Sequence, residues 1–359
     1  MGGYVEIPHI VRPSSLAELD AGGYLAANPD VRAIGARAED HFTWYGKAEG
    51  RPQWVNADRI ARARDAKLAR VRFRRDPAPR AAGEPAHFLS RAQHEAFRIP
   101  DDPPISSNDY GGHLVELIRA NPEKLFLDVG AGLRHSYFGN VVNTEIFPWA
   151  TTDVVCVGED LPFASDQFDY VLSFAVLEHT RRPWDVAREM CRVLKPGGEV
   201  WVDYPFLQPV HGYPHHYFNA TPMGSASLFE PFCDIKTLEI FDNNHPIRAL
   251  RWILEEWRAG LPPDDAARFG ALRIADLLAT SADDQMDSFY SRNLSADARR
   301  TIAAGSGLVG IKRAVAIPPQ DAAEQETARL ARALDAIRAS TSWRLTAPLR
   351  ALGNVLRRR

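Results

Sequence analysis

Residues 124–132 read KLFLDVGAG, an apolar run that ends in an aspartate and two glycines. A short apolar run that stops at a glycine turn is typical of a buried parallel strand. The Asp-x-Gly-x-Gly turn leaves no side chain between the backbone and an approaching ligand. This stretch predicts the first strand of an α/β sheet, with a ligand site at the carboxyl end of that strand.

The residues after this turn continue to alternate between β-rich and helical patterns. Further strands are predicted at 141–146, 153–157, 168–174 and 199–204, with later candidates at 233–241 and 308–315. A helix is predicted at 183–194, between Pro183 in its first turn and the sequence KPGG after it. Such alternation predicts a doubly wound, Rossmann-like α/β sheet. The link at 147–152 is shorter than the ~10–12 residues of a helical crossover, so we expect a pared-down first half of the sheet.

An ordered series of motifs follows the glycine turn: GEDLPF at 158–163, FDYVLS at 168–173, VLEH at 176–179 and RVLKPGG at 192–198. This series resembles the class I S-adenosylmethionine-dependent methyltransferases of the type 11 kind. The resemblance covers residues 125–228 and implies S-adenosylmethionine as cofactor and methyl donor. We expect the methyltransferase domain to span residues 110–318.

The same resemblance implies a set of cofactor-binding residues near the strand ends. They are Asp128, Gly130, Gly132, Glu145, Glu159, Asp160, Leu161, Ser173 and Phe174. Asp128 and the two glycines would hold the methionine amino group and the ribose, and Glu145 the ribose hydroxyls. An acidic residue that often binds the adenine amine is replaced here by Val157. Either Glu159 or Asp160 takes its place, or backbone and apolar contacts alone hold the adenine.

The loop after the fifth predicted strand, DYPFLQPVHGYPHHYFN at 203–219, combines three histidines, three tyrosines and a glutamine. These side chains suit a hydroxylated substrate, and His211 or His216 is our candidate for the base that takes a hydroxyl proton. The alternative is an aromatic loop that only caps the site. No metal site is predicted, because prolines oppose a helix here and no carboxylate or cysteine lies within the loop after Asp203.

The flanking segments predict accessory roles. Residues 14–51 predict a small helical module with a core of Tyr24, Leu25, Val31, Phe42, Trp44 and Tyr45. The module resembles those of bacterial surface-polysaccharide assembly proteins, which suggests a glycosyltransferase partner. Residues 52–109, rich in Arg, Ala and Pro, predict a linker with one basic helix near 59–74. Residues 320–359 predict a helix and a basic amphipathic tail, suited to an anionic membrane surface or else a solvated terminus.

Composition sets further bounds on function. A net charge of -3 gives no overall attraction to nucleic acid. The three cysteines are far apart in sequence, so we expect neither a disulfide framework nor a zinc site built on them. The N-terminus lacks a signal-peptide pattern, and no run reaches the ~18 apolar residues of a membrane span. We therefore expect a cytoplasmic protein that can lie at the inner face of the membrane through its tail.

These observations favour a methyltransferase that acts on a hydroxyl of a sugar or glycan precursor in bacterial surface polysaccharide biosynthesis. One alternative is a non-catalytic scaffold that keeps the fold and docks polysaccharide enzymes. Another is a methyltransferase of a small metabolite or quinone.

Overall fold

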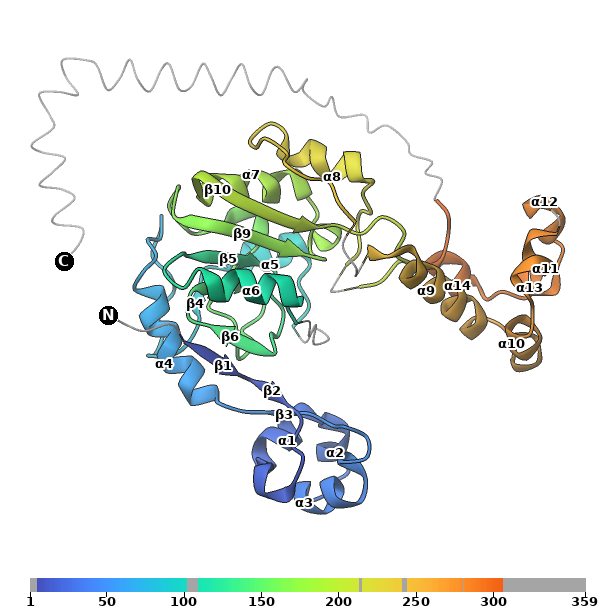
Figure 1. The fold of residues 1–359 in the computed structure, drawn as a ribbon, viewed down its shortest axis with the longest axis horizontal. Coiled ribbons are helices and arrows are strands. Elements are labelled where there is room, and N and C mark those ends of the chain that lie inside the picture. Colours follow the sequence, from blue (N-terminus) through green and yellow to red (C-terminus); the bar gives the residue numbers. More distant parts are fainter. Residues whose placement is uncertain (1–4, 102–108, 213–214, 241–243, 280, 306–359) are drawn as a thin grey trace, which may run out of the picture. The chain divides into compact units, whose positions relative to one another are not determined.

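A six-stranded parallel sheet forms the centre of the computed structural model, which describes residues 5–101, 109–212, 215–240, 244–279 and 281–305. The strand order is β10-β9-β5-β7-β8-β4 (Figure 1). The strands are β4 (Ala86–His87), β5 (Phe126–Val129), β7 (Val141–Glu145), β8 (Val154–Val155), β9 (Phe168–Phe174) and β10 (Leu194–Asp203). From β5 the chain moves outward through β7 and β8, then returns to add β9 and β10 on the other side of β5. The predicted Rossmann-like α/β class is confirmed.

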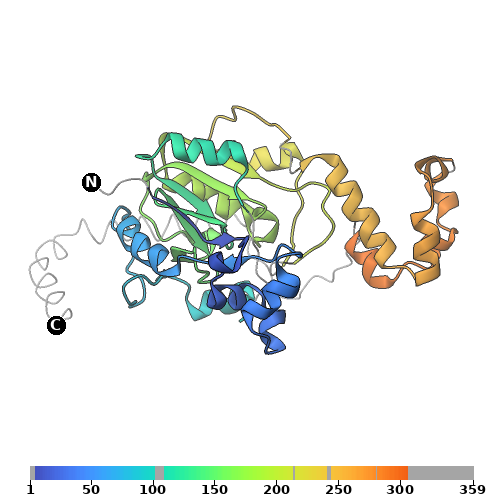
Figure 2. The ribbon, with the colours of Figure 1, turned by 60° about the horizontal axis from the view of Figure 1, so that its bottom comes forward.

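Alternating side chains along the strands divide the core into two clusters, one on each face of the sheet. Phe126 of β5 is fully buried in a cluster with Ile118 of α6 (Gly112–Ala120). The next residue, Leu127, belongs to the opposite cluster, which contains Met190 of α7 (Pro183–Val193). Because successive side chains of a strand point to opposite faces, this alternation covers both faces with helices. Figure 2 shows α6, in teal, lying along its face of the sheet.

The first half of the sheet is pared down as predicted. Between β5 and β7 the chain forms β6 (Ser136–Phe138), which pairs antiparallel with β1 (Glu6–Pro8). No helix lies between β7 and β8. The fold replaces these missing crossover helices with a helix from the N-terminal side of the chain, α4 (Ala57–Leu68).

Helix α4 is held by a buried polar cluster around Asp153. The ammonium of Lys67 lies 2.7 Å from Asp153 Oδ2, and Tyr137 Oη donates to Oδ1 at 2.6 Å. All three side chains are fully buried. Burial lowers the pKa of Lys67 to about 8, although the charge of Asp153 opposes this.

The expectation of a linker at 52–109 is therefore wrong for most of its length. Besides α4, this stretch supplies β4 at the sheet edge, paired with β8, and α5 (Arg91–Phe97). The basic helix expected near 59–74 is present as α4, but its packing into the core was not expected, because its buried face contains Arg64 and Lys67 beside Ile60 and Leu68. Two of its four inward residues are cations, so the helix has no clear apolar stripe in the sequence.

The N-terminal module at 14–51 is helical, as expected. It contains η1 (Leu16–Glu18), α1 (Ala21–Ala27), α2 (Pro29–Ala33), α3 (Ala38–His41) and the π-helix η2 (Phe42–Gly46). Two short strands, β2 (Ile10–Val11) and β3 (Gln53–Trp54), pair where the chain enters and leaves it. Tyr24, Val31 and Phe42 form the expected core, with Leu25 packed against it. Trp44 and Tyr45 are 77% and 60% exposed, so their predicted place in that core is wrong.

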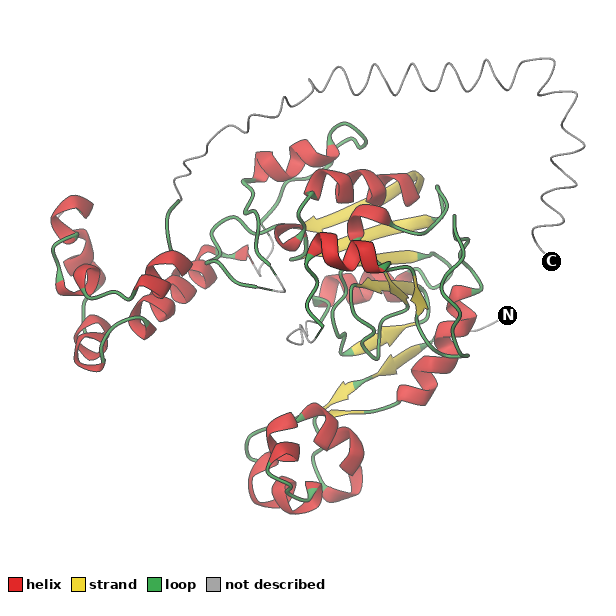
Figure 3. Ribbon diagram, turned by 180° about the vertical axis from the view of Figure 1, so that it is seen from behind, coloured by secondary structure: helices red, strands yellow, loops and turns green. Residues whose placement is uncertain are grey.

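Beyond the sheet, the regular elements of the described chain are helices joined by loops (Figure 3). The helices are α8 (Pro222–Phe229), α9 (Pro246–Ala259), α10 (Pro263–Gly270), α11 (Ile274–Leu278), α12 (Ala282–Gln285), α13 (Phe289–Arg292) and α14 (Ala296–Thr301). The strand predicted at 233–241 is wrong, because 233–240 form a loop with no strand partner. The strand at 308–315 and the tail at 320–359 lie outside the described residues. Among those described, no helix has both the length and the apolar character needed to cross a bilayer.

Candidate functional site

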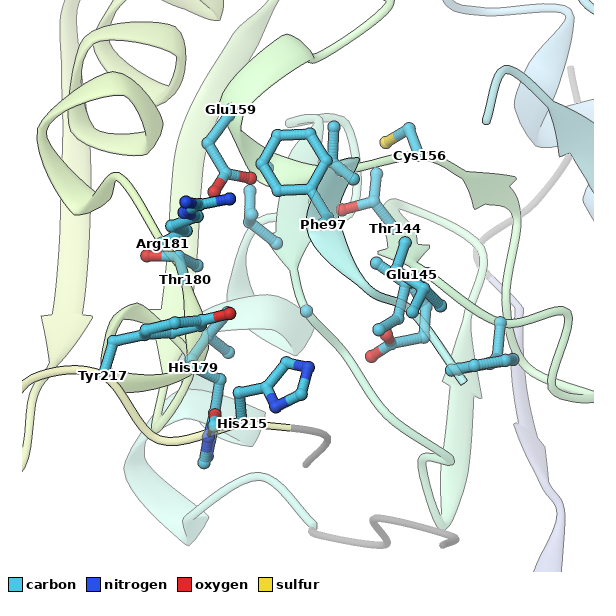
Figure 4. Close-up of a pocket in the computed structure, with 18 of the residues that line it drawn as sticks. Phe97, Thr144, Glu145, Cys156, Glu159, His179, Thr180, Arg181, His215 and Tyr217 are labelled. Carbon is cyan, nitrogen blue, oxygen red and sulfur yellow. Dashed lines mark hydrogen bonds between the residues drawn. The ribbon is translucent and has the colours of Figure 1, made fainter. Parts of the chain in front are cut away.

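A cavity opens at the carboxyl ends of β5, β7, β8 and β9, where the order of the strands reverses. Open α/β sheets bind their ligands at this position. Its wall is built from several separate elements and includes Phe97, Gly130, Glu145, Val157, Glu159, Val176, His179 and Tyr217. In Figure 4 His179 and Tyr217 lie together at one end, and Glu145 approaches from another side.

The glycine turn after β5 has a geometry that only glycine adopts without strain. Gly130 has φ of +76° and Gly132 has φ of +61°. A Cβ atom on Gly130 would lie 2.6 Å from both methyl carbons of Val176. The cavity wall therefore depends on Gly130 both for its backbone angle and for the space that Val176 occupies.

Asp128, at the base of this turn, is fully buried behind the cavity wall. Its Oδ2 accepts hydrogen bonds from Arg134 Nε at 2.9 Å and from the hydroxyl of Tyr110 at 2.5 Å. Its Oδ1 has no hydrogen-bond partner among the described residues. Arg134 is itself buried and lies over the Tyr110 ring. One oxygen of Asp128 thus has no partner among the described residues, while Arg134 balances the charge of the carboxylate.

Glu145 lies on the cavity wall with its carboxylate fixed by the backbone. Its Oε2 accepts from Gly132 N at 2.9 Å, and its Oε1 accepts from Ile146 N at 2.6 Å. Burial raises the pKa of Glu145, and these two amide hydrogen bonds oppose the rise. The carboxylate is therefore held in one orientation at the end of β7, as a group that binds a diol requires.

The structure separates the two acidic candidates that follow Val157. Glu159 lies on the cavity wall, its Oε1 is buried without a hydrogen-bond partner among the described residues, and burial raises its pKa. Asp160 is instead engaged by Arg74 and by Arg75, whose Nη2 lies 2.8 Å from Oδ2. The expected cofactor role of Asp160 is therefore not supported, because its carboxylate serves these ion pairs and it does not line the cavity.

Asp128 and Gly132 do not line the cavity either, and three more predicted cofactor residues also lie off its wall. Leu161 is in the hydrophobic core, Ser173 is buried within β9, and Phe174 packs against the cluster beside α6. The wall after β9 is formed instead by Ala175 and Val176. Ala175 has φ of +55°, an uncommon angle for a residue with a Cβ. The motif correctly predicted the strand at 168–174. The residues that line the cavity come just after this strand, whereas we expected them within it, at Ser173 and Phe174.

The histidine loop packs against the short helix η4 (Leu177–His179) that follows β9. Tyr217 N donates to Glu178 O at 2.7 Å, and His179 Nδ1 donates to His215 O at 2.7 Å. The ring centroid of His211 lies 4.9 Å from that of His179 and 4.4 Å from that of His216. Both predicted bases therefore lie together beside His179, which lines the cavity. Burial lowers the pKa of His179 to about 4 and also lowers that of His211.

The two predicted bases differ in their hydrogen bonds. His211 Nδ1 donates to Pro209 O at 2.8 Å, so the lone pair of its neutral ring is on Nε2. His216 Nδ1 accepts from His211 N at 3.2 Å, and its Nε2 donates to Asn219 Oδ1 at 2.8 Å. The lone pair of His216 is thus used within the loop, and His211 is the better placed of the two to take a proton.

A carboxylate also reaches this cluster from outside the loop. Glu178 is fully buried, and neither of its carboxylate oxygens has a hydrogen-bond partner among the described residues. Burial raises the pKa of Glu178 to about 8. Because Glu178 lies outside the loop, the pattern of the loop did not indicate a carboxylate beside these histidines.

A second cavity lies at the carboxyl end of β10. Its wall combines aromatic side chains with amide and charged groups, among them Phe206, Gln208, Asn244, Arg248 and Trp252. The ring centroid of His211 lies 5.1 Å from that of Trp252. His211 therefore contacts a residue of each cavity wall, His179 in the first and Trp252 in the second.

Comparison with known proteins finds similarity to methyltransferases over part of the chain. Residues 128–202 match the family model of a methyltransferase domain. An uncharacterised methyltransferase of Mycobacterium tuberculosis is 49% identical over 57 residues, which are 16% of this chain and 22% of that protein. One of Mycobacterium leprae is 44% identical over 69 residues, 19% of this chain and 26% of that protein. The chain thus spans about a quarter of the length of these relatives.

Among solved structures, phosphoethanolamine N-methyltransferase 2 of Haemonchus contortus is similar, with 19% sequence identity and a TM-score of 0.31. The match covers 55% of this chain and 51% of that one.

Proposed function

We propose that this chain is an S-adenosylmethionine-dependent methyltransferase that methylates a hydroxyl of a sugar or glycan precursor in bacterial surface polysaccharide biosynthesis. One observation carries the proposal. A single cavity at the switch point of the sheet joins the glycine turn and Glu145 to a histidine cluster. The motif series and the match of residues 128–202 to a methyltransferase domain support it.

The residues present fit the donor. Glu145 is held where it can accept hydrogen bonds from two ribose hydroxyls. Glu159 Oε1, on the cavity wall, is a buried acceptor without a partner among the described residues and suits the adenine amine. Asp128 Oδ1, behind the wall at the base of the glycine turn, is a second such acceptor and suits the methionine amino group. S-adenosylmethionine supplies a methyl group that its sulfonium already activates. The protein therefore has to bind, orient and exclude water, and Phe97 and Val176 add apolar wall for that purpose.

The second cavity, at the carboxyl end of β10, has a lining that suits a carbohydrate acceptor. Aromatic rings with nearby amide and charged groups can stack on a sugar and bind its hydroxyls, and the second cavity combines these in Trp252, Gln208 and Asn244. His211 lies beside Trp252 and next to His179 of the donor cavity. A hydroxyl bound there can pass its proton to His211 Nε2 as the methyl group arrives.

The flanking segments extend the proposal to partners. Ile34, Trp44 and Tyr45 are exposed on the module at 14–51, which gives it apolar surface for docking a glycosyltransferase. The basic residues at 320–359 would bind an anionic membrane surface, which places the acceptor near lipid-linked glycans.

Calorimetric titration of S-adenosylmethionine and S-adenosylhomocysteine into the full chain tests the donor site. We expect micromolar binding that Glu145→Gln weakens at least tenfold, because a charge-assisted hydrogen bond contributes about 1.5–3 kcal/mol. Glu159→Gln should also weaken binding, whereas the matched control Asp160→Asn should not. Absence of binding by the folded protein would refute the proposal. With binding established, a methyl-group mass increase in nucleotide sugars or lipid-linked glycans tests the acceptor class.

A further inference from the structure

Three side chains with metal-binding atoms meet beside the donor cavity. They are Glu178 and His179 of η4 and His211 of the loop after β10, and one donor atom of each lies within 4.8 Å of the others. His179 also forms part of the cavity wall. The fold thus brings a carboxylate and two imidazoles from separate segments to one point at the edge of the site.

Glu178 is the observation that points to a cation. Its side chain is fully buried, and neither carboxylate oxygen has a hydrogen-bond partner among the described residues. The ring nitrogen Nε2 of His179 lies 3.7 Å from Oε1, which is beyond hydrogen-bond distance. No lysine or arginine of the described chain forms an ion pair with Glu178. A buried carboxylate normally has hydrogen-bond donors, a paired cation or a metal ion, and the described residues supply Glu178 with neither of the first two.

Both histidines have the support that metal ligands usually have. His179 Nδ1 donates to His215 O, and His211 Nδ1 donates to Pro209 O. Each neutral ring therefore has its lone pair on Nε2, with its orientation fixed by a backbone carbonyl. His216 differs, because its Nδ1 accepts from His211 N and its Nε2 donates to Asn219.

We propose that Glu178, His179 and His211 bind one divalent transition-metal ion, with zinc as the best match. Two histidines and one glutamate with an open fourth position are typical of catalytic zinc. Imidazole ligands disfavour magnesium and calcium, which prefer oxygen. Because His179 lines the cavity, an ion bound to it would lie beside the donor site.

The chemical role of the ion rests on the proposed methyl transfer. A hydroxyl that occupies the open position has its pKa lowered by the ion, as a zinc-bound water does. Its proton leaves to solvent, and its oxygen forms the new bond to the methyl carbon as the carbon–sulfur bond of the donor breaks. His211 then acts as a metal ligand instead of accepting the proton directly.

Titration of zinc and cobalt(II) into the full chain, first stripped of metal with a chelator, tests the site. We expect one equivalent to bind, with a visible cobalt spectrum typical of low coordination number. Glu178→Gln and His211→Ala should each weaken binding at least tenfold, and magnesium should not compete. The matched control is His113→Gln, which removes an exposed imidazole from α6 and should leave binding unchanged.

The same stripped protein is titrated with S-adenosylhomocysteine, so that the two proposals can fail separately. Circular dichroism of each variant checks that it is folded, and His211→Ala, in a half-exposed loop position, serves if Glu178→Gln does not fold. Failure of the wild type to bind zinc or cobalt overturns the metal site, as does unchanged binding by both ligand variants. If the stripped protein binds S-adenosylhomocysteine but neither zinc nor cobalt, the donor site is supported and the metal site is overturned.

Discussion

Replacing Gly130 with alanine tests whether the cavity depends on the fit between this glycine and Val176. The new Cβ would lie 2.6 Å from both Val176 methyl carbons, about 1 Å closer than carbon atoms normally approach. Overpacking of this kind costs about 1–3 kcal/mol. The backbone angle of +76° adds roughly 1–2 kcal/mol for a residue with a Cβ. We therefore expect Gly130→Ala to lower the free energy of unfolding by about 2–5 kcal/mol.

A double-mutant cycle separates the two contributions. Val176→Ala removes the methyl groups that the new Cβ would meet, so the double variant should recover the overpacking cost and retain the backbone cost. Urea unfolding of the four proteins, followed by circular dichroism, would then give a coupling energy of about 1–3 kcal/mol between the two sites. Additive effects of the two substitutions would refute the packing argument. Binding of S-adenosylmethionine should stay weak in the double variant, because the alanine that replaces Gly130 is still strained and still narrows the cavity.

Two further predictions concern stability. The pKa of Lys67, about 8 in the fold, lies below the value of about 10.4 for an unfolded chain, so the unfolded state binds more protons between these pH values. Stability of the wild type relative to Lys67→Met should therefore rise by roughly 2 kcal/mol from pH 7.5 to pH 10, and a flat or falling difference in urea unfolding would contradict this. Ala175→Gly should raise the free energy of unfolding by roughly 0.5–1 kcal/mol, because its φ of +55° suits glycine, and a clear loss of stability would show that the angle is not strained.

The strands of the sheet, the glycine turn and the acidic residue after β7 could be predicted, because local sequence patterns determine them. The apolar run before Gly130 forms β5, and the acidic residue at the end of β7, Glu145, lies on the cavity wall. Both conclusions needed only strand patterns and the rule that ligands bind at carboxyl ends.

The rest depends on contacts between residues that are distant in sequence. No sequence motif identified Tyr110 and Arg134 as the partners of Asp128. In the sequence, Asp160 was as good a candidate for binding the adenine amine as Glu159, because its ion pair with Arg75 is a long-range contact. The proximity of Glu178 to His211 could not be predicted either, because it arises only when the histidine loop packs onto η4.

Helix α4 changes where the boundary of this domain has to be drawn. A fragment that begins at Tyr110 contains every motif and the whole segment 128–202 that matches a methyltransferase domain, yet it lacks Lys67. Asp153 would then lose its buried cation, 86 residues away in sequence, and the short crossover beside it would lose its cover. Excising the domain at this motif boundary would therefore leave a sheet without its edge strand β4 and without the cover of α4, and the unit that can be transplanted into another protein starts upstream of α4.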